Sequence, residues 1–288
     1  MTSTKGIVLA GGSGNRLYPM TAAFSKQLQP VYDKPMIAYP LSTLMMAGIR
    51  EILIISTPQD TPVFQRLLGD GKNWGVELQY AVQDEPRGIA DAFRVGRSFI
   101  ADNQVCLILG DNIFYGKLDF LRNAIASNEG ATIFGYHVQD PERYGVVELN
   151  DKGDVVSLEE KPLTPRSHLA VPGLYVYTQD VCDIASALSP SARGEFEITD
   201  VHHAYLKSNR LRVTQLGRGI AWLDTGTPES MLEASTFIHA IEKRQGMKIG
   251  CIEEVAWRQG FIDDDGYRRV VESLPQSSYR TYCEQLLR

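Results

Sequence analysis

The chain has 288 residues, of which 43% are hydrophobic and 22% charged, as in globular proteins with a sizeable core. Its formal net charge of −6 argues against a broad nucleic-acid-binding surface. No apolar run reaches the roughly 18 residues of a membrane span, and no basic, apolar signal segment opens the chain. We therefore expect a cytoplasmic protein with neither a nucleic-acid nor a membrane partner.

The first half of the chain alternates short apolar runs with segments of helical periodicity. We predict strands at 6–10, 51–56, 77–82, 105–109 and 131–137, and helices at 41–48, 61–68 and 88–100. This βαβ pattern predicts an α/β fold with a Rossmann-like, mostly parallel sheet that is flanked by helices.

The second half begins with strand-rich sequence and ends with helical sequence. Strands are predicted at 145–149, 155–158 and 171–177, and helices at 180–188 and 198–208. From Pro228, which suits a first helical position, the pattern is mainly helical. We expect residues 1–227 to form an α/β core with a strand-rich insertion, and residues 228–288 to form a helical region of the same compact domain.

Cysteines and histidines show no metal-binding or disulfide pattern. Cys106, Cys182, Cys251 and Cys283 are widely spaced, and we expect them to be reduced. His202 and His203 are adjacent, so on a helix they would point in different directions.

A glycine loop, Gly11-Gly12-Ser13-Gly14-Asn15-Arg16, follows the first predicted strand. Ligands of open α/β sheets bind beyond the carboxyl ends of the strands, where this loop lies. Its backbone N–H groups would approach phosphate oxygens, and Arg16 would add a positive fork. The loop matches neither the dinucleotide fingerprint nor the P-loop spacing. A tight turn beside a surface arginine is the alternative interpretation.

Two aspartates stand where a metal ligand would be useful. Asp111 lies just past the apolar strand in the stretch LILGDN, and Asp224 precedes a predicted helix in WLDTGTP. Mg²⁺ binds one or two carboxylates together with substrate phosphates. Helix capping or a turn is the alternative for both residues.

Further polar residues follow predicted strands or lie on connections. Lys26 and Lys161 are candidate phosphate cations, and Glu160 is a candidate acceptor for sugar hydroxyls. Gln83 carries an amide that both donates and accepts, which suits a pyrimidine edge. Each of these residues taken alone could equally be a solvated surface group.

Taken together, seven stretches resemble the sugar nucleotidylyltransferase family over nearly the whole chain: LAGGSGNRLYP, SKQLQPVYDKPMI, LGDNIFYG, DPERYGVVE, SLEEKP, RGEFEITD and AWLDTGT. DKPMI, DPERYGVVE and AWLDTGT indicate its thymidylyltransferase branch. The resemblance implies Mg²⁺-dependent transfer of a thymidylyl group from dTTP to α-D-glucose 1-phosphate by direct displacement. The products would be dTDP-glucose and pyrophosphate, in the first step toward dTDP-L-rhamnose or a related deoxysugar.

The resemblance also implies roles for individual residues. The nucleotide would be bound by Gly11, Gly14, Asn15, Arg16, Lys26, Gln27, Gln83, Gly88 and Asp111. The sugar would be bound by Asn112, Gly145, Glu160, Lys161 and the backbone of Val171, in a pocket that Tyr144 and Trp222 line. Asp111 and Asp224 would hold Mg²⁺, and the catalytic set would be Arg16, Lys26, Lys161 and Asp111.

Members of this family are typically homotetramers with a second, regulatory nucleotide site at a subunit interface. In this chain we expect Tyr115, Gly116, Arg218 and Arg258 to form that site, with residues 228–288 contributing to the interface.

Four residues depart from the family pattern: Asn15 and Pro172 replace threonines, while Arg87 and Ile89 alter the base-reading stretch. They leave a UTP-using uridylyltransferase as the main alternative. A catalytically silent regulatory subunit is disfavoured because both aspartates, Arg16 and Lys26 are present. A dinucleotide-dependent oxidoreductase is disfavoured because the glycine register fails.

Overall fold

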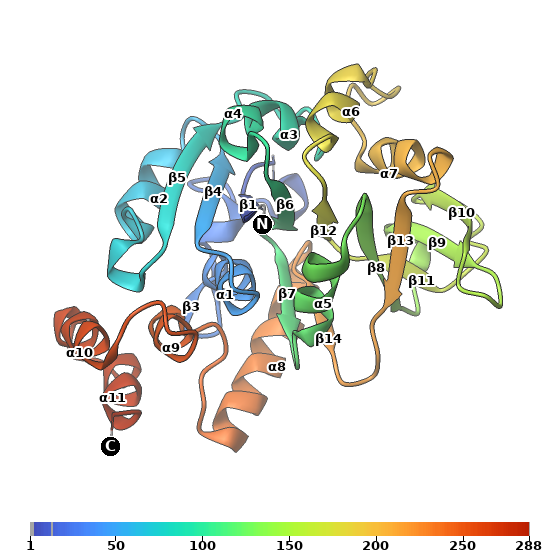
Figure 1. The fold of residues 1–288 in the computed structure, drawn as a ribbon. Coiled ribbons are helices and arrows are strands. Elements are labelled where there is room, and N and C mark those ends of the chain that lie inside the picture. The colour runs from blue at the N-terminus through green and yellow to red at the C-terminus, as the bar shows by residue number, and fades with distance from the viewer. Residues whose placement is uncertain (1–2, 13, 288) are drawn as a thin grey trace.

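The computed structural model describes residues 3–12 and 14–287, so Ser13 of the glycine loop lies outside the described residues (Figure 1). Its centre is a ten-stranded sheet, within the described residues, in the order β10-β9-β11-β8-β12-β6-β1-β4-β5, with β13 beside β8. The strands are β1 (Thr4–Leu9), β4 (Glu51–Ser56), β5 (Glu77–Val82), β6 (Gln104–Leu109), β8 (Ala131–His137), β9 (Gly145–Leu149), β10 (Val155–Glu160), β11 (Leu169–Val171), β12 (Leu174–Tyr177) and β13 (Leu211–Gln215).

Helices cover both faces of this sheet (Figure 1). The helices of the described residues are α1 (Ala38–Met46), α2 (Thr61–Leu68), α3 (Asp91–Val95), α4 (Arg97–Ile100), α5 (Asp119–Ser127), α6 (Val181–Ala187), α7 (Ile198–Lys207), α8 (Pro228–Gln245), α9 (Ile252–Arg258), α10 (Asp264–Ser273) and α11 (Ser278–Gln285). Of these, α10 and α11 lie away from the sheet (Figure 1). Two short ribbons stand apart from the sheet: β2 (Pro30–Val31) with β3 (Lys34–Pro35), and β7 (Asn112–Tyr115) with β14 (Ala221–Asp224).

The parallel centre of the sheet has the predicted form. β1 pairs in parallel with β4 and β6, and β4 pairs in parallel with β5. Along β1, Val8 packs into one core with Leu41 of α1, while Ile7 packs into the opposite core with Phe93 of α3. The central strands are continuously apolar because both of their faces are covered. The predicted α/β fold with a mostly parallel sheet is confirmed.

Two predicted elements are each divided in the structure. The strand predicted at 171–177 is interrupted at Pro172 and Gly173, which separate β11 from β12. A proline has no N–H for a sheet ladder, and the N–H of Gly173 donates to Asn112 Oδ1 at 2.9 Å instead of to a neighbouring strand. The ladder therefore breaks at these two residues. The helix predicted at 88–100 begins only at Asp91, because Gly88 has a φ of +96°, and it divides at Gly96.

Short elements between the larger ones were not predicted. They are α5, β13, the β2–β3 ribbon and the ribbon of β7 and β14, in which Asp224 lies opposite Asn112. β7 and β14 have four residues each and lie about 100 residues apart in the chain, so no local pattern indicates their pairing.

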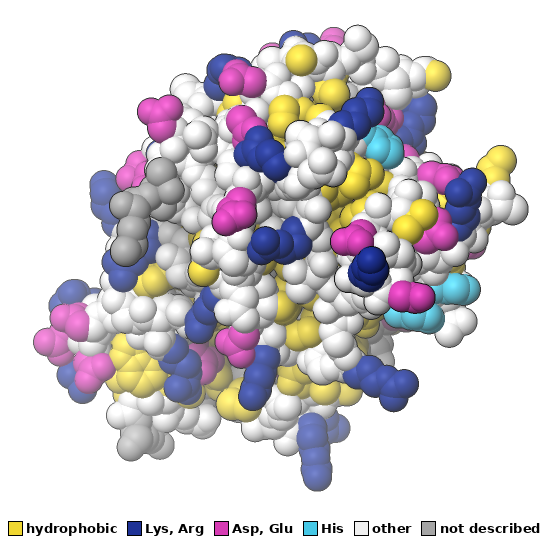
Figure 2. All heavy atoms as spheres, turned by 45° about the vertical axis from the view of Figure 1, so that its right-hand side comes forward, with side chains coloured by type: hydrophobic (Ala, Val, Ile, Leu, Met, Phe, Trp, Pro, Cys, Tyr) yellow, Lys and Arg dark blue, Asp and Glu magenta, His cyan; other side chains and the backbone are white. Residues whose placement is uncertain are grey.

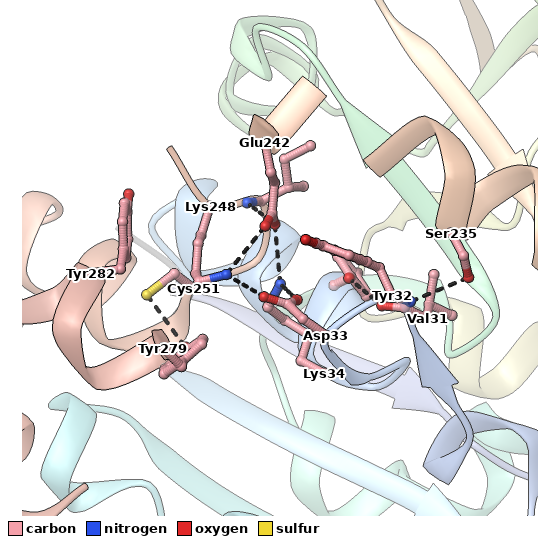
Figure 3. Close-up of polar contacts among 12 residues, drawn as sticks. Val31, Tyr32, Asp33, Lys34, Ser235, Glu242, Lys248, Cys251, Tyr279 and Tyr282 are labelled. Atoms are coloured by element: carbon pink, nitrogen blue, oxygen red, sulfur yellow. Dashed lines mark hydrogen bonds and ion pairs between the residues drawn. The ribbon is translucent and has the colours of Figure 1, made fainter. Parts of the chain in front are cut away.

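A buried charge network joins the C-terminal helices to the β2–β3 ribbon (Figure 3). Glu242 of α8 accepts from Lys34 and Lys248, each at 3.2 Å, and both lysines also contact Asp33. Lys34 and Glu242 are almost fully buried. Removing one member of such a network would leave an unpaired charge inside the protein, so it holds α8 and the residues after it against the core.

The surface carries both charge signs. On the face in Figure 2, basic and acidic side chains are intermingled rather than gathered into one patch. Among the described residues, no helix has the length and apolar character needed to cross a membrane.

His202 of α7 provides a test of this core. Burial, and to a lesser degree the charge of His203, lower the pKa of His202 to about 3, while its Nε2 lies 2.6 Å from the hydroxyl of Tyr177. In the unfolded chain a histidine titrates near pH 6.5, so below that pH the unfolded state binds the extra proton. This histidine alone therefore removes up to about 1.4 kcal/mol of unfolding free energy per pH unit as the pH falls from about 6.5 toward 3.

The variant His202→Gln keeps a polar partner for Tyr177, but its glutamine side chain does not bind a proton in this pH range. Urea unfolding at pH 7 and at pH 4.5 gives the fall in unfolding free energy between these two pH values. We expect this fall to be smaller by about 2 to 3 kcal/mol in His202→Gln than in the unmodified chain. His239→Gln, which changes an exposed histidine, serves as the control. Equal losses in all three proteins would contradict the prediction.

Candidate active site

The carboxyl ends of the parallel strands bring the predicted residues to one edge of the sheet. The N–H of Ala10 after β1 donates to Ile55 O at 2.7 Å, and the N–H of Gly110 after β6 donates to Leu9 O at 2.9 Å. The N–H of Gln83 after β5 donates to Ser56 O at 2.9 Å. The glycine loop, Gln83 and Asp111 therefore begin side by side, as expected for an open α/β sheet.

Three adjoining cavities of about 200, 280 and 220 Å³ form a groove at this edge. We call them the inner, outer and loop cavities. Asp111, Glu160 and Lys161 line both the inner and the outer cavity. Lys26 lines the outer and the loop cavity, and Arg16 lines the inner and the loop cavity. Charged side chains thus mark the junctions between the cavities.

The groove collects all the residues predicted to bind nucleotide, sugar or metal. The outer cavity has Gly11, Lys26, Gln27, Gln83, Gly88 and Asp111 in its wall, and the loop cavity has Gly14, Asn15, Arg16 and Lys26. The inner cavity has Arg16, Asp111, Asn112, Tyr144, Gly145, Glu160, Lys161, Val171, Trp222 and Asp224.

The β7–β14 ribbon brings the two aspartates together. Asp111 lies in the turn before β7, and its carbonyl oxygen accepts from the N–H of Thr225 at 3.2 Å and from its hydroxyl at 2.8 Å. Asp224 is the last residue of β14, and the cap of α8 is Thr227. Helix capping is therefore excluded as the reason for either carboxylate.

The two carboxylates differ in their electrostatic surroundings. Burial and the charge of Asp111 raise the pKa of Asp224 to about 6, although Lys26, Arg16 and Arg143 act in the opposite direction. Burial also acts to raise the pKa of Asp111, but the ion pair with Lys26 outweighs it and holds this pKa below its usual range. Two adjacent carboxylates that repel each other are a donor set that fits a divalent cation.

The glycine loop brings Arg16 close to Asp224. Gly14 has a φ of +59°, and a Cβ there would lie 2.9 Å from Thr21 Cγ2, so the turn into the 3-10 helix Asn15–Leu17 requires glycine. A Cβ on Gly226 would lie 3.0 Å from Arg16 Nη2 and 3.2 Å from Asp224 Oδ2. The small residue thus lets the guanidinium approach Asp224.

Gln83 and Gln27 both line the outer cavity. Gln83 Nε2 donates to Asp91 Oδ2 at 3.0 Å and to Gly88 O at 3.3 Å, which leaves its oxygen as the available group. The buried oxygen of Gln27 has no hydrogen-bond partner among the described residues. Buried polar atoms without partners are uncommon, so a bound ligand would complete this wall.

The inner cavity has its own polar wall. Glu160 Oε2 accepts from Thr199 Oγ1 at 2.8 Å, and a Cβ on Gly145 would lie 3.4 Å from the same oxygen. Lys161 has a φ of +45°, a strained conformation for a non-glycine residue, while its N–H donates to Tyr144 O at 3.0 Å. The backbone thereby turns Lys161 toward the junction with the outer cavity.

Sequence reasoning did not single out several residues of the groove. Arg143 approaches Asp224 Oδ2 to 3.8 Å, and Arg193 and Glu197 line the outer cavity as an ion pair at 2.9 Å. They lie within the motifs DPERYGVVE and RGEFEITD. Their position in these motifs was the only indication in the sequence that they could belong to the site. The second motif reaches the groove because Phe196 bonds through its backbone to Arg87 and Ala90.

The four residues predicted to form a regulatory site lie outside the three cavities. Tyr115 ends β7 and bonds to Gln245 of α8, and a Cβ on Gly116 would lie 2.4 Å from Gly219 O, next to the exposed Arg218. Arg258 pairs with Glu254 of its own helix at 2.6 Å. The structure thus brings Tyr115, Gly116 and Arg218 to one end of the β7–β14 ribbon, and Arg258 to α9.

Comparison with known proteins identifies the family of the chain. Residues 5–241 match the model of the nucleotidyl transferase family, and the chain belongs to this family. It is 55% identical to a glucose-1-phosphate thymidylyltransferase of Xanthomonas campestris pv. campestris (strain B100), over 99% of this chain and 98% of the relative. It is 56% identical to the protein of the same name in Mycolicibacterium smegmatis, over 98% and 99% of the two chains.

Solved structures show the same fold. A Bacillus anthracis protein described as a glucose-1-phosphate thymidylyltransferase, in complex with sucrose, is 38% identical with a TM-score of 0.77, over 82% of this chain and 95% of that chain. A UDP-glucose pyrophosphorylase complexed with UDP-glucose is 24% identical with a TM-score of 0.73, over 84% and 99% of the two chains. The second likeness shows the fold alone.

The ion pair between Lys26 and Asp111 can be tested through stability. Lys26→Met leaves the buried Asp111 carboxylate without its closest cation, and we expect a loss of about 3 kcal/mol in unfolding free energy. The double variant Lys26→Met/Asp111→Asn has no charge to leave unpaired, so most of this loss should return. Urea unfolding at pH 7.5 measures both effects, and equal stability of the single and the double variant would refute the interpretation.

Proposed function

We propose that the chain transfers a thymidylyl group from dTTP to α-D-glucose 1-phosphate, giving dTDP-glucose and pyrophosphate. The observation that carries this proposal is the pair of buried carboxylates: Asp111 lines both the inner and the outer cavity, and Asp224 lines the inner one. The cations Lys26, Arg16 and Lys161 line the same groove. The names of the relatives at 55% and 56% identity support the same reaction.

The outer and loop cavities are the proposed site of dTTP. The oxygen of Gln83 would accept from the N3–H of thymine, and the peptide at Gly88 would lie against the base. Arg16, Lys26 and the N–H groups of the glycine loop would bind the triphosphate, as cations and glycine-rich backbone do in other phosphate sites.

The inner cavity is the proposed site of glucose 1-phosphate. Glu160, with one oxygen held by Thr199, would accept from sugar hydroxyls beside Gly145 and the backbone of Val171. Lys161 at the junction would bind the phosphate group. Asn112 has a positioning role in this proposal, because its amide already bonds to Asp111, Trp222 and Gly173.

Asp111 and Asp224 are the proposed ligands of one Mg²⁺ ion. The raised pKa of Asp224 reflects burial and a repulsion that a divalent cation would relieve. When bound, such an ion would polarise phosphoryl oxygens as a Lewis acid and neutralise their charge. Substrate phosphates and water would supply its remaining ligands.

The reaction needs charge neutralisation more than proton transfer. A phosphate oxygen of glucose 1-phosphate, which is ionised at neutral pH, attacks the α-phosphorus of dTTP. The bond between this phosphorus and the oxygen that bridges it to the β-phosphorus breaks, and pyrophosphate leaves. Lys161 would hold the attacking phosphate, while Arg16 and Lys26 would stabilise charge on the transferred and leaving groups. No general base is required.

The proposal has two candidate nucleotide substrates, dTTP and UTP. Gln83 would accept from an N3–H that thymine and uracil share, so this contact favours neither base. Arg87 is half-exposed beside the base-binding wall and pairs with Asp91 at 3.6 Å. UTP use is therefore the second candidate, and the fold shared with UDP-glucose pyrophosphorylase is compatible with it.

The remaining expectations from the family resemblance stay part of this proposal. They are a homotetramer, a regulatory nucleotide site at Tyr115, Gly116, Arg218 and Arg258, the division of roles between residues 1–227 and 228–288, a cytoplasmic location and a product used for rhamnose or a related deoxysugar. The four free, buried cysteines are compatible with a reducing compartment.

Pyrophosphate release tests the reaction and its metal site. With glucose 1-phosphate and Mg²⁺, we expect faster turnover with dTTP than with UTP, and a loss of at least about 100-fold in Asp111→Asn. The control Asp151→Asn changes an exposed turn aspartate and should keep full activity. Faster turnover with UTP would select the second candidate, and full activity of Asp111→Asn would refute the proposed metal role.

Glu160 tests the assignment of the inner cavity. Replacing a charged acceptor weakens a hydrogen bond by about 1.5 to 3 kcal/mol, so in Glu160→Gln we expect the KM for glucose 1-phosphate to rise about 10- to 100-fold. The KM for dTTP should change much less. Glu159→Gln, which alters the exposed neighbour on the opposite face of β10, is the matched control. A larger effect on the KM for dTTP would contradict the assignment.

A further inference from the structure

A second cluster of reactive side chains lies in the C-terminal helices, away from the groove. Cys251 precedes α9, Glu253 lies in the first turn of α9, and Cys283 lies on α11. Their ligand atoms are all within 4.8 Å of one another, and all three residues are buried. We call these three residues the thiol cluster. The two cysteines that look widely spaced in the sequence are thus neighbours in the fold.

The two sulfurs have the separation expected for metal ligands. Cys251 Sγ and Cys283 Sγ lie 3.8 Å apart. The sulfurs of a disulfide are about 2.05 Å apart, whereas two thiolates at about 2.3 Å from one tetrahedral Zn²⁺ ion lie about 3.8 Å apart. The carboxylate of Glu253 has one oxygen 3.8 Å from Cys251 Sγ, on the same side of the cluster.

Glu253 is a buried carboxylate that lacks a cation. Only 6% of this residue is exposed, and among the described residues no basic side chain forms an ion pair with it. The nearby Lys248 contacts Asp33 and Glu242 instead, as Figure 3 shows. Buried charges in proteins are normally paired or bind a metal.

Tyr279 gives the cluster a fourth ligand position and a route to solvent. Its hydroxyl lies 3.3 Å from Cys251 Sγ (Figure 3). The same hydroxyl donates to Glu253 Oε2. Tyr279 and Cys283 are four residues apart on α11, so both face α9. Tyr279 and Glu253 also line a separate cavity of about 260 Å³ that extends to Leu67 and Trp74, through which an ion could enter.

We propose that Cys251, Cys283 and Glu253 bind one Zn²⁺ ion, with the Tyr279 hydroxyl or a water molecule as fourth ligand. Thiolate ligands select zinc over magnesium, so this site is chemically distinct from the carboxylate pair of the groove. Binding releases the two thiol protons to solvent. The ion links α9 to α11 and stabilises the C-terminal helices. The proposal does not depend on the reaction catalysed in the groove.

Binding of Co²⁺ to the full chain tests the site. A sulfur-to-cobalt charge-transfer band appears only when a thiolate binds the ion, so carboxylate sites do not produce it. We expect the reduced, metal-free protein to bind one equivalent of Co²⁺ with this absorption, and Zn²⁺ to displace it. In Cys283→Ala the charge-transfer band should fall and the affinity for zinc should weaken about 100-fold or more. Cys182→Ala removes a buried cysteine of another core and should keep the full band.

Glu253→Gln keeps both cysteines and covers the case in which Cys283→Ala does not fold. It should also bind zinc more weakly, and zinc should raise the melting temperature of the unmodified chain more than that of this variant. The proposal is overturned if the unmodified chain shows no thiolate band, if Cys283→Ala keeps the full band, or if zinc stabilises Glu253→Gln equally. A Cys251–Cys283 disulfide as the main form of the purified protein would also overturn it.

Discussion

The groove depends on holding two carboxylates, Asp111 and Asp224, close together in a largely buried place. Their mutual repulsion and their loss of water are unfavourable, as the raised pKa of Asp224 indicates. The cations Lys26, Arg16 and Arg143 offset this only in part in the ligand-free chain. The site is therefore prepared for further positive charge, and a divalent cation bound with a polyphosphate would supply it.

The surrounding fold serves to hold that pair in position. The β7–β14 ribbon fixes Asp224 opposite Asn112, and the amide of Asn112 joins Asp111 to Trp222 and to the break between β11 and β12. That break is the point at which Pro172 and Gly173 end one strand and begin another. An irregularity of the sheet thus helps to position Asp111, which lines both the inner and the outer cavity.

The C-terminal helices are attached to the core by two kinds of interaction, a buried charge network and an apolar contact. Their first attachment is the charge network of Asp33, Lys34, Glu242 and Lys248, and their second is the apolar contact of Ile252 and Ala256 with the core around α1. Beyond these contacts, α10 and α11 have a small core of their own around Tyr267. A metal link at the thiol cluster would compensate for the limited apolar area of this region.

The sequence by itself determined the parallel sheet and the chemical character of the groove. A continuous apolar run such as that of β4 indicates a strand that is buried on both faces. Gln83 and Asp111 follow the carboxyl ends of strands, and in open α/β sheets ligands generally bind beyond these ends. Tertiary structure alone decided which distant residues meet. The four-residue strands β7 and β14, the packing of Phe196 on Gly88 and the contact of Cys251 with Cys283 join segments that are 32 to 112 residues apart. Such contacts arise from global packing and leave no local periodicity. Only the family resemblance of the motifs around Asp111 and Asp224 indicated that these two segments meet.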